Sequence, residues 1–166
     1  MSRYEFSLFL HVVAAAAWFG AALLSMALLE LASRAGELSW LVRFGEFDDS
    51  LAKALFIPAA LVTLVAGLVL VFDGPWSFGD DGWVTGGLIL LVAIFALGIG
   101  LIVPTGQRLT EAAKSALAPP AELEAPAVDL NDRTEVTDLI RRLRLLSWVD
   151  VSLLAIVFFL MTVKPF

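Results

Sequence analysis

The chain has 166 residues, of which 60% are hydrophobic and 17% are charged, and its formal net charge is −6. About half of the residues of a soluble domain are apolar and about a quarter are charged, so this composition excludes an ordinary soluble domain and indicates a protein of the lipid bilayer. The sequence has no basic stripe typical of nucleic-acid binding. It also has no cysteine, which excludes disulfides, thiolate metal sites and cysteine nucleophiles.

Long apolar runs divide the chain into membrane-crossing segments. The first run has 24 residues, and at about 1.5 Å per residue it spans roughly 36 Å, more than a bilayer core of about 30 Å. We therefore predict an all-α fold in which residues 1–166 form one four-helix transmembrane bundle. The expected helices cover residues 6–29, 51–72, 83–103 and 145–163, with a cytoplasmic helical linker over about 105–144.

Basic residues are distributed unevenly among the connections. Residues 73–82 contain no lysine or arginine, and Arg3 and Lys164 are the only basic residues near the same side. The other nine basic residues lie in or beside the first and third connections. Because positively charged loops stay in the cytoplasm, we expect both termini to lie outside.

The first connection, residues 31–50, alternates apolar and charged side chains. This pattern predicts a short helix that lies on the membrane surface. Asp48, Asp49 and Ser50 are then expected to cap the N-terminus of the second transmembrane helix, where anionic groups are favoured.

Proline and glycine mark positions where the predicted helices deviate from regular geometry. Pro58 lies inside the second apolar run, where it lacks an N–H group and leaves the carbonyl of Ala54 without its usual donor, so we expect a kink. Such a kink can either mark a site or serve packing alone. Helix three is rich in glycine, which favours close helix packing, and a polar helical pattern continues beyond Pro104.

Two ionisable residues, His11 and Asp150, lie inside the apolar runs. Burying such a group costs at least about 2.5 to 3.5 kcal/mol on insertion scales, so each needs a physical reason. From their depths in a core of about 30 Å, they lie on the order of 14 Å apart along the membrane normal and are not direct partners. For Asp150 we favour a structural ion pair with Lys53, Arg43 or Arg108 over a proton relay.

The only histidine, His11, has two interpretations. The first is structural, a hydrogen bond to Asp73 or to a backbone carbonyl. The second is ligation of haem, with Met161 or a second copy of the chain supplying the other axial ligand. Copper bound by His11 and Met161, and at most also Met1, is a further form of this hypothesis. No nucleophile–base pair, phosphate-binding loop or zinc-binding helix motif occurs in the sequence, which favours a non-enzymatic protein.

Short motifs at both ends carry a family resemblance. The spacing His11-x6-Trp18-Phe19-Gly20 opens the first helix, and the chain closes on residues 160–165, LMTVKP. The sequence resembles an uncharacterised bacterial family of predicted four-helix integral membrane proteins. It is more distantly similar to the membrane domain of the copper resistance protein D family and to the haem-binding membrane protoporphyrinogen oxidase. The resemblance implies a helical bundle in a bacterial inner membrane, without an established reaction, and the oxidase implies a haem-ligand role for His11.

Together these observations predict an integral membrane protein that acts as an accessory or scaffold subunit, as a homodimer or within a larger membrane complex. The alternative is a haem- or copper-handling protein centred on His11, with Met161 as a second ligand. Asp150, Asp73 and Pro58 are expected to have structural roles. Apart from haem and copper at His11, we predict no cofactor, and the expected surroundings are the lipid bilayer.

Overall fold

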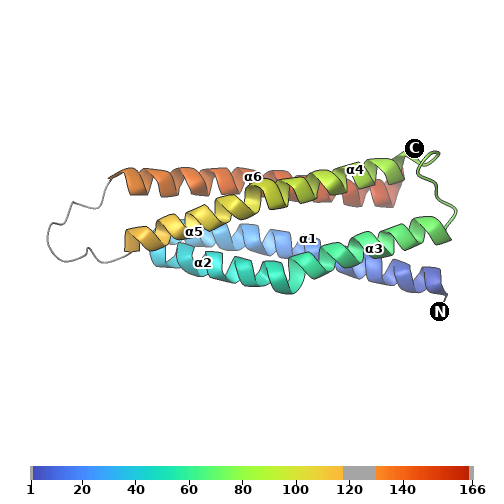
Figure 1. Cartoon of the computed structure of the whole chain (residues 1–166), viewed down its shortest axis with the longest axis horizontal. Coiled ribbons are helices and arrows are strands. Elements are labelled where there is room, and N and C mark those ends of the chain that lie inside the picture. The colour runs from blue at the N-terminus through green and yellow to red at the C-terminus, as the bar shows by residue number, and fades with distance from the viewer. Residues whose placement is uncertain (1, 118–129, 165–166) are drawn as a thin grey trace.

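The computed structural model describes residues 2–117 and 130–164, with side chains from residue 134 onward in the second range. All regular structure in these ranges is helical and forms four long rods (Figure 1). Four helices are long and apolar enough to cross a membrane, which confirms the predicted all-α fold with four spanning helices. The helical elements are α1 (Arg3–Ala35), α2 (Leu38–Leu51), η1 (Ala52–Phe56), α3 (Ile57–Asp73), α4 (Gly82–Leu97), η2 (Gly98–Ile102), α5 (Val103–Leu117) and α6 (Leu130–Val163).

Two of the rods consist of several elements joined without a break. One contains α2, η1 and α3, and the other contains α4, η2 and α5. Of the predicted linker over residues 105–144, the first part is the end of α5 and the last part is the beginning of α6. Residues 118–129, the middle of that prediction, lie outside the described residues.

The second rod begins earlier than predicted, at Leu38. Gly36 adopts a left-handed conformation (φ 72°) at the end of α1, so the chain reverses direction within two residues and enters α2 directly. The first connection is therefore a packed helix, in contact with α1 and α5, instead of a helix lying on the membrane surface.

The residues expected to cap the second helix lie inside its rod; Asp48 binds a partner on α1, whereas Asp49 and Ser50 bind partners within the same rod. The Ser25 hydroxyl of α1 donates to the Asp48 carboxylate at 2.5 Å. The Lys53 ammonium donates to Asp49 at 2.6 Å, and the Ser50 hydroxyl donates to a backbone carbonyl one turn earlier. Asp48 therefore joins α2 to α1, and the capping prediction is wrong.

A proline follows each π-helical segment at the same distance. Pro58 lies two residues beyond η1, and Pro104 lies two residues beyond η2. A proline lacks an N–H group, and its ring clashes with the carbonyl four residues earlier in a regular α-helix. The wider π turn relieves this clash, and the residue before each proline donates its N–H to the first residue of the π segment. The predicted kink at Pro58 thus takes the form of a π segment where the rod bends (Figure 1).

The four rods form a closed ring in one half of the molecule. There α1 packs against α2, α2 against α5, α5 against α6, and α6 against α1. We call this part the closed half. Its core consists of Leu29, Ala32, Leu41, Phe44, Leu109, Ala113, Val136 and Leu143.

The ring is interrupted in the other half, which we call the open half. There α3 packs against α1, α1 against α6, and α6 against α4. Within the described residues, however, α3 and α4 make almost no direct contact with each other. A second core cluster, which includes Trp18, Ala60, Ile94 and Leu154, lies between these helices. In Figure 1, α3 and α4 lie farther apart in this half than α2 and α5 do at the opposite end.

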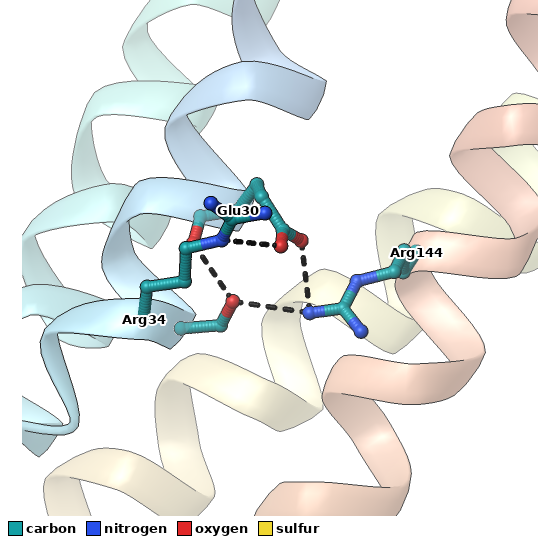
Figure 2. Close-up of polar contacts among 4 residues, drawn as sticks. Glu30, Arg34 and Arg144 are labelled. Carbon is teal, nitrogen blue, oxygen red and sulfur yellow. Dashed lines mark hydrogen bonds and ion pairs between the residues drawn. The ribbon is translucent and has the colours of Figure 1, made fainter.

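Charged residues connect α1 and α6 in the closed half (Figure 2). Arg144 of α6 donates to Glu30 at 2.9 Å and to the Ser33 hydroxyl at 3.1 Å, and Arg34 donates to the other oxygen of Glu30 at 2.8 Å. Each spanning helix has at least 30 residues, so it is about 45 Å long or more, whereas the bilayer core is about 30 Å. The charged end of the closed half therefore has the length to extend beyond the lipid.

Candidate functional site

The open half contains a cavity of about 330 Å³. Side chains from α1, α3, α4 and α6 line it, together with Trp76 and Phe78 from the connection between α3 and α4. Most of the lining is aliphatic or aromatic, and its few polar groups include Tyr4, His11 and Thr63. Small-molecule sites typically have volumes of about 300 to 1,000 Å³, mostly apolar walls and a few placed polar groups. The cavity has the size and the composition of such a site.

His11 projects from α1 into this cavity and contacts α3. Its Nδ1 atom lies 2.8 Å from the backbone carbonyl oxygen of Thr63. A carbonyl can only accept a hydrogen bond, so Nδ1 carries the proton and donates it. Of the two hydrogen-bond partners considered for His11, a backbone carbonyl and not Asp73 lies beside its ring. The other ring nitrogen, Nε2, has no hydrogen-bond partner among the described residues.

A glycine of α3 allows this close approach. A Cβ atom added to Gly67 would lie 2.9 Å from Cε1 of His11 and 3.1 Å from its Nδ1. Real Cβ contacts are essentially never that short. Gly67 lies four residues after Thr63, on the same face of α3, so the two residues together form the surface on which the imidazole rests.

The hydroxyl of Thr63 is the second polar feature of this wall. Thr63 is only 8% exposed, and its Oγ1 atom has no hydrogen-bond partner among the described residues. A buried hydroxyl without a partner costs about 1 to 3 kcal/mol. An unpaired Thr63 hydroxyl and the free Nε2 of His11 therefore belong to neighbouring side chains of the same cavity wall.

Aromatic rings and one lysine surround the mouth of the cavity. Trp76 and Trp83 meet edge to face with their centroids 5.0 Å apart. The Lys164 ammonium lies 4.0 Å from the centroid of the Trp76 ring and 5.2 Å from that of Trp83. Lys164 is the only formally charged side chain among the described cavity-lining residues, and these two rings already stabilise its charge.

The other residues predicted for the site are found in several places. Met161 lines the same cavity as His11, against Gly87 of α4. Asp73 lies at the end of α3, where it accepts a hydrogen bond from the Arg3 guanidinium at 2.8 Å and forms an ion pair with Nε of Arg3 at 2.6 Å. Pro58 lies outside the cavity lining, in the first turn of α3.

Asp150 does not meet its expected basic partners. Among the described residues its carboxylate forms no ion pair. Of the expected partners, Lys53 pairs with Asp49, and the Arg43 guanidinium lies 5.7 Å from the centroid of the Trp40 ring. Asp150 lies on α6 beside Val151, a member of the second core cluster. From their positions in the sequence, these basic residues were expected at a depth similar to that of Asp150. In the structure their side chains contact other residues instead.

The described residues also contain no group of three or more histidine, cysteine, aspartate or glutamate side chains that could hold a metal ion. Any metal in the cavity would therefore depend on His11 together with the thioether of Met161 or with ligands that this chain does not supply. Thr63, Gly67 and Gly87 were not predicted from the sequence to be part of the site. The only signal for the first two is their four-residue spacing, which is also common in ordinary membrane-helix packing.

A comparison with protein-family models finds a match over residues 6–165 to the family described as "Predicted integral membrane protein (DUF2269)". Searches of curated proteins and of solved structures found no match. The match covers almost the whole chain and therefore includes residues of all four rods.

Replacing Gly67 by alanine should force the His11 ring away from Thr63, because the new Cβ would lie 2.9 Å from Cε1. Overpacking of this kind costs about 1 to 3 kcal/mol, so we expect a lower unfolding temperature in detergent. Gly20→Ala is the matched control, since its Cβ meets no heavy atom within 4 Å. Equal unfolding temperatures for the two variants would contradict the described packing of His11.

Proposed function

The chain belongs to this family of predicted integral membrane proteins, and we propose that it binds a small lipid-soluble molecule inside the bilayer. The binding site is the cavity between α1, α3, α4 and α6, and the observation that carries the proposal is its volume of about 330 Å³. The near absence of contact between α3 and α4 supports access from the surrounding lipid.

The energetic cost of an unfilled hollow supports the same proposal. Apolar walls that meet no partner atoms lose dispersion contacts that a filled site would keep. A molecule that fills the cavity would recover much of this free energy through contacts with its apolar walls. We propose that binding alone, without a chemical reaction, is the activity.

We further propose that the protein is an accessory subunit in a bacterial cytoplasmic (inner) membrane, as a homodimer or in a larger complex, with both termini outside. The distribution of basic residues supports this orientation. Arg34, Arg144 and Lys114 lie in the closed half, where each has an acidic partner. The connection between α3 and α4 has no basic residue.

Haem or copper binding at His11 is a second candidate, and one observation favours it. Nδ1 of His11 donates to the Thr63 carbonyl, so the lone pair of Nε2 is available as a metal ligand. Met161, which supplies a thioether, lines the same cavity. In this proposal His11 and Met161 hold the metal, and Lys164 at the mouth attracts an anionic group such as a haem propionate.

Gly87→Leu should fill part of the cavity and weaken binding. Gly87 is a buried cavity-lining residue of α4. With 1-bromoundecane as the probe in nanodiscs, we expect saturable quenching of tryptophan fluorescence in the unchanged protein, because Trp18, Trp76 and Trp83 line the site. We expect about tenfold weaker binding in Gly87→Leu, which corresponds to about 1.4 kcal/mol. The lipid-facing Gly20→Leu should retain the affinity, and equal loss in both variants would refute the cavity as the site.

His11→Gln separates the two candidate functions. An amide is a far poorer ligand for haem iron or copper than an imidazole. If His11 holds the metal, protein expressed with haem and copper available should show a Soret band or bound copper, and the variant should lose it. Equal absorbance spectra and equal metal contents in the two proteins would eliminate the second candidate.

Cysteine labelling tests the proposed orientation in this cysteine-free chain. Gly79→Cys, in the connection between α3 and α4, should react with an impermeant maleimide added to intact cells. Glu37→Cys, an exposed position between α1 and α2, should react only after the membrane is permeabilised. The opposite labelling pattern would refute the orientation.

A further inference from the structure

We infer that the cavity takes a neutral, single-chain lipid that carries a hydroxyl group, an alcohol or a phenol, and that His11 accepts a hydrogen bond from this hydroxyl. The inference rests on the proposed function and specifies its ligand. It follows from the protonation of the His11 ring, the unpaired Thr63 hydroxyl and the charges around the cavity.

The hydrogen bond to Thr63 determines what His11 can offer a ligand. Because Nδ1 donates to the Thr63 carbonyl, a neutral ring carries no proton on Nε2, which can then only accept a hydrogen bond. A ligand at Nε2 must therefore donate. A hydroxyl group does so, whereas a ketone, an ester or an ether does not.

The Thr63 hydroxyl complements this requirement. It is buried and unpaired among the described residues, and it belongs to the residue whose carbonyl binds His11. A ligand hydroxyl that donates to Nε2 keeps its lone pairs, and one of them can accept a hydrogen bond from Thr63. The Thr63 Oγ1 atom is itself buried, so this second hydrogen bond requires rotation of the Thr63 side chain toward the ligand.

The charges around the cavity exclude a carboxylate or a phosphate as the group at His11. The only formally charged side chain among the described lining residues is Lys164 at the mouth, already stacked on Trp76 and Trp83. His11 lies seven residues beyond Tyr4 along α1, about 10 Å deeper. An anion at that depth would be unpaired in an apolar site, which costs several kcal/mol.

The shape of the cavity favours one chain. Its lining residues run along α1 from Tyr4 to Trp18, about 21 Å at 1.5 Å per residue. The volume of about 330 Å³ is near the lower limit for small-molecule sites. Because α3 and α4 are separated in this half, a single chain can reach the site from the bilayer without passing through water.

Three probes with the same brominated chain test the inference: 11-bromoundecan-1-ol, its methyl ether and 11-bromoundecanoate. Each is titrated into nanodiscs that contain the Trp40→Phe, Trp148→Phe double variant, which keeps the three cavity-lining tryptophans. Quenching of fluorescence then reports on the cavity. We expect the alcohol to bind about tenfold more tightly than the ether or the carboxylate, the value of one good hydrogen bond.

His11→Phe in the same background should remove the preference for the alcohol over the ether. The comparison of probes on the histidine-containing protein stands even if this variant does not fold. Equal binding of alcohol and ether, or tighter binding of the carboxylate, would overturn the inference and leave the proposed function standing. An absence of saturable quenching by all three probes, and by 1-bromoundecane, would overturn both.

Discussion

The structure depends on how two helices accommodate a proline inside a membrane. A lipid environment has no water to satisfy a backbone group that a proline leaves without a partner, so a simple break in the helix would be costly there. At Pro58 and at Pro104 the preceding π segment maintains backbone pairing while the direction of the helix changes. Both rods can therefore bend at equivalent positions, pack together as α2 and α5, and separate as α3 and α4.

The closed half provides the packing that the open half lacks. Leu29 and Leu109 are fully buried there, and Arg144 connects α6 to Glu30 and Ser33 of α1. Single ion pairs of this exposure contribute only about 0 to 1 kcal/mol, so the apolar core supplies most of the stability and the ion pairs fix the register of the two helices. With one end fixed in this way, α3 and α4 can remain apart without collapsing onto the cavity.

The sequence predicted the features that depend on composition along the chain. Four apolar runs identified the four spanning helices, because length and hydropathy alone determine whether a segment can cross a bilayer. It did not predict features that depend on neighbours across the bundle. Asp48 resembles a helix cap in the sequence, yet its partner is Ser25 of another helix. The cavity itself depends on the angle between two rods. The sequence features that indicate a bend in these rods are the two prolines, Pro58 and Pro104.

The single histidine shows why its structural and its binding interpretations are compatible. In a metal or ligand site, the hydrogen bond made by one ring nitrogen commonly determines the tautomer and orientation of the other. Here the bond from His11 to the Thr63 carbonyl holds the ring against Gly67 and leaves Nε2 as an acceptor. The contact that explains why a histidine is tolerated in an apolar helix is thus the same contact that prepares it to bind. A glutamine also has one donor and one acceptor atom, but it carries them on neighbouring positions of a flexible side chain and not on separate edges of a rigid ring, so the imidazole has a chemical reason to be there.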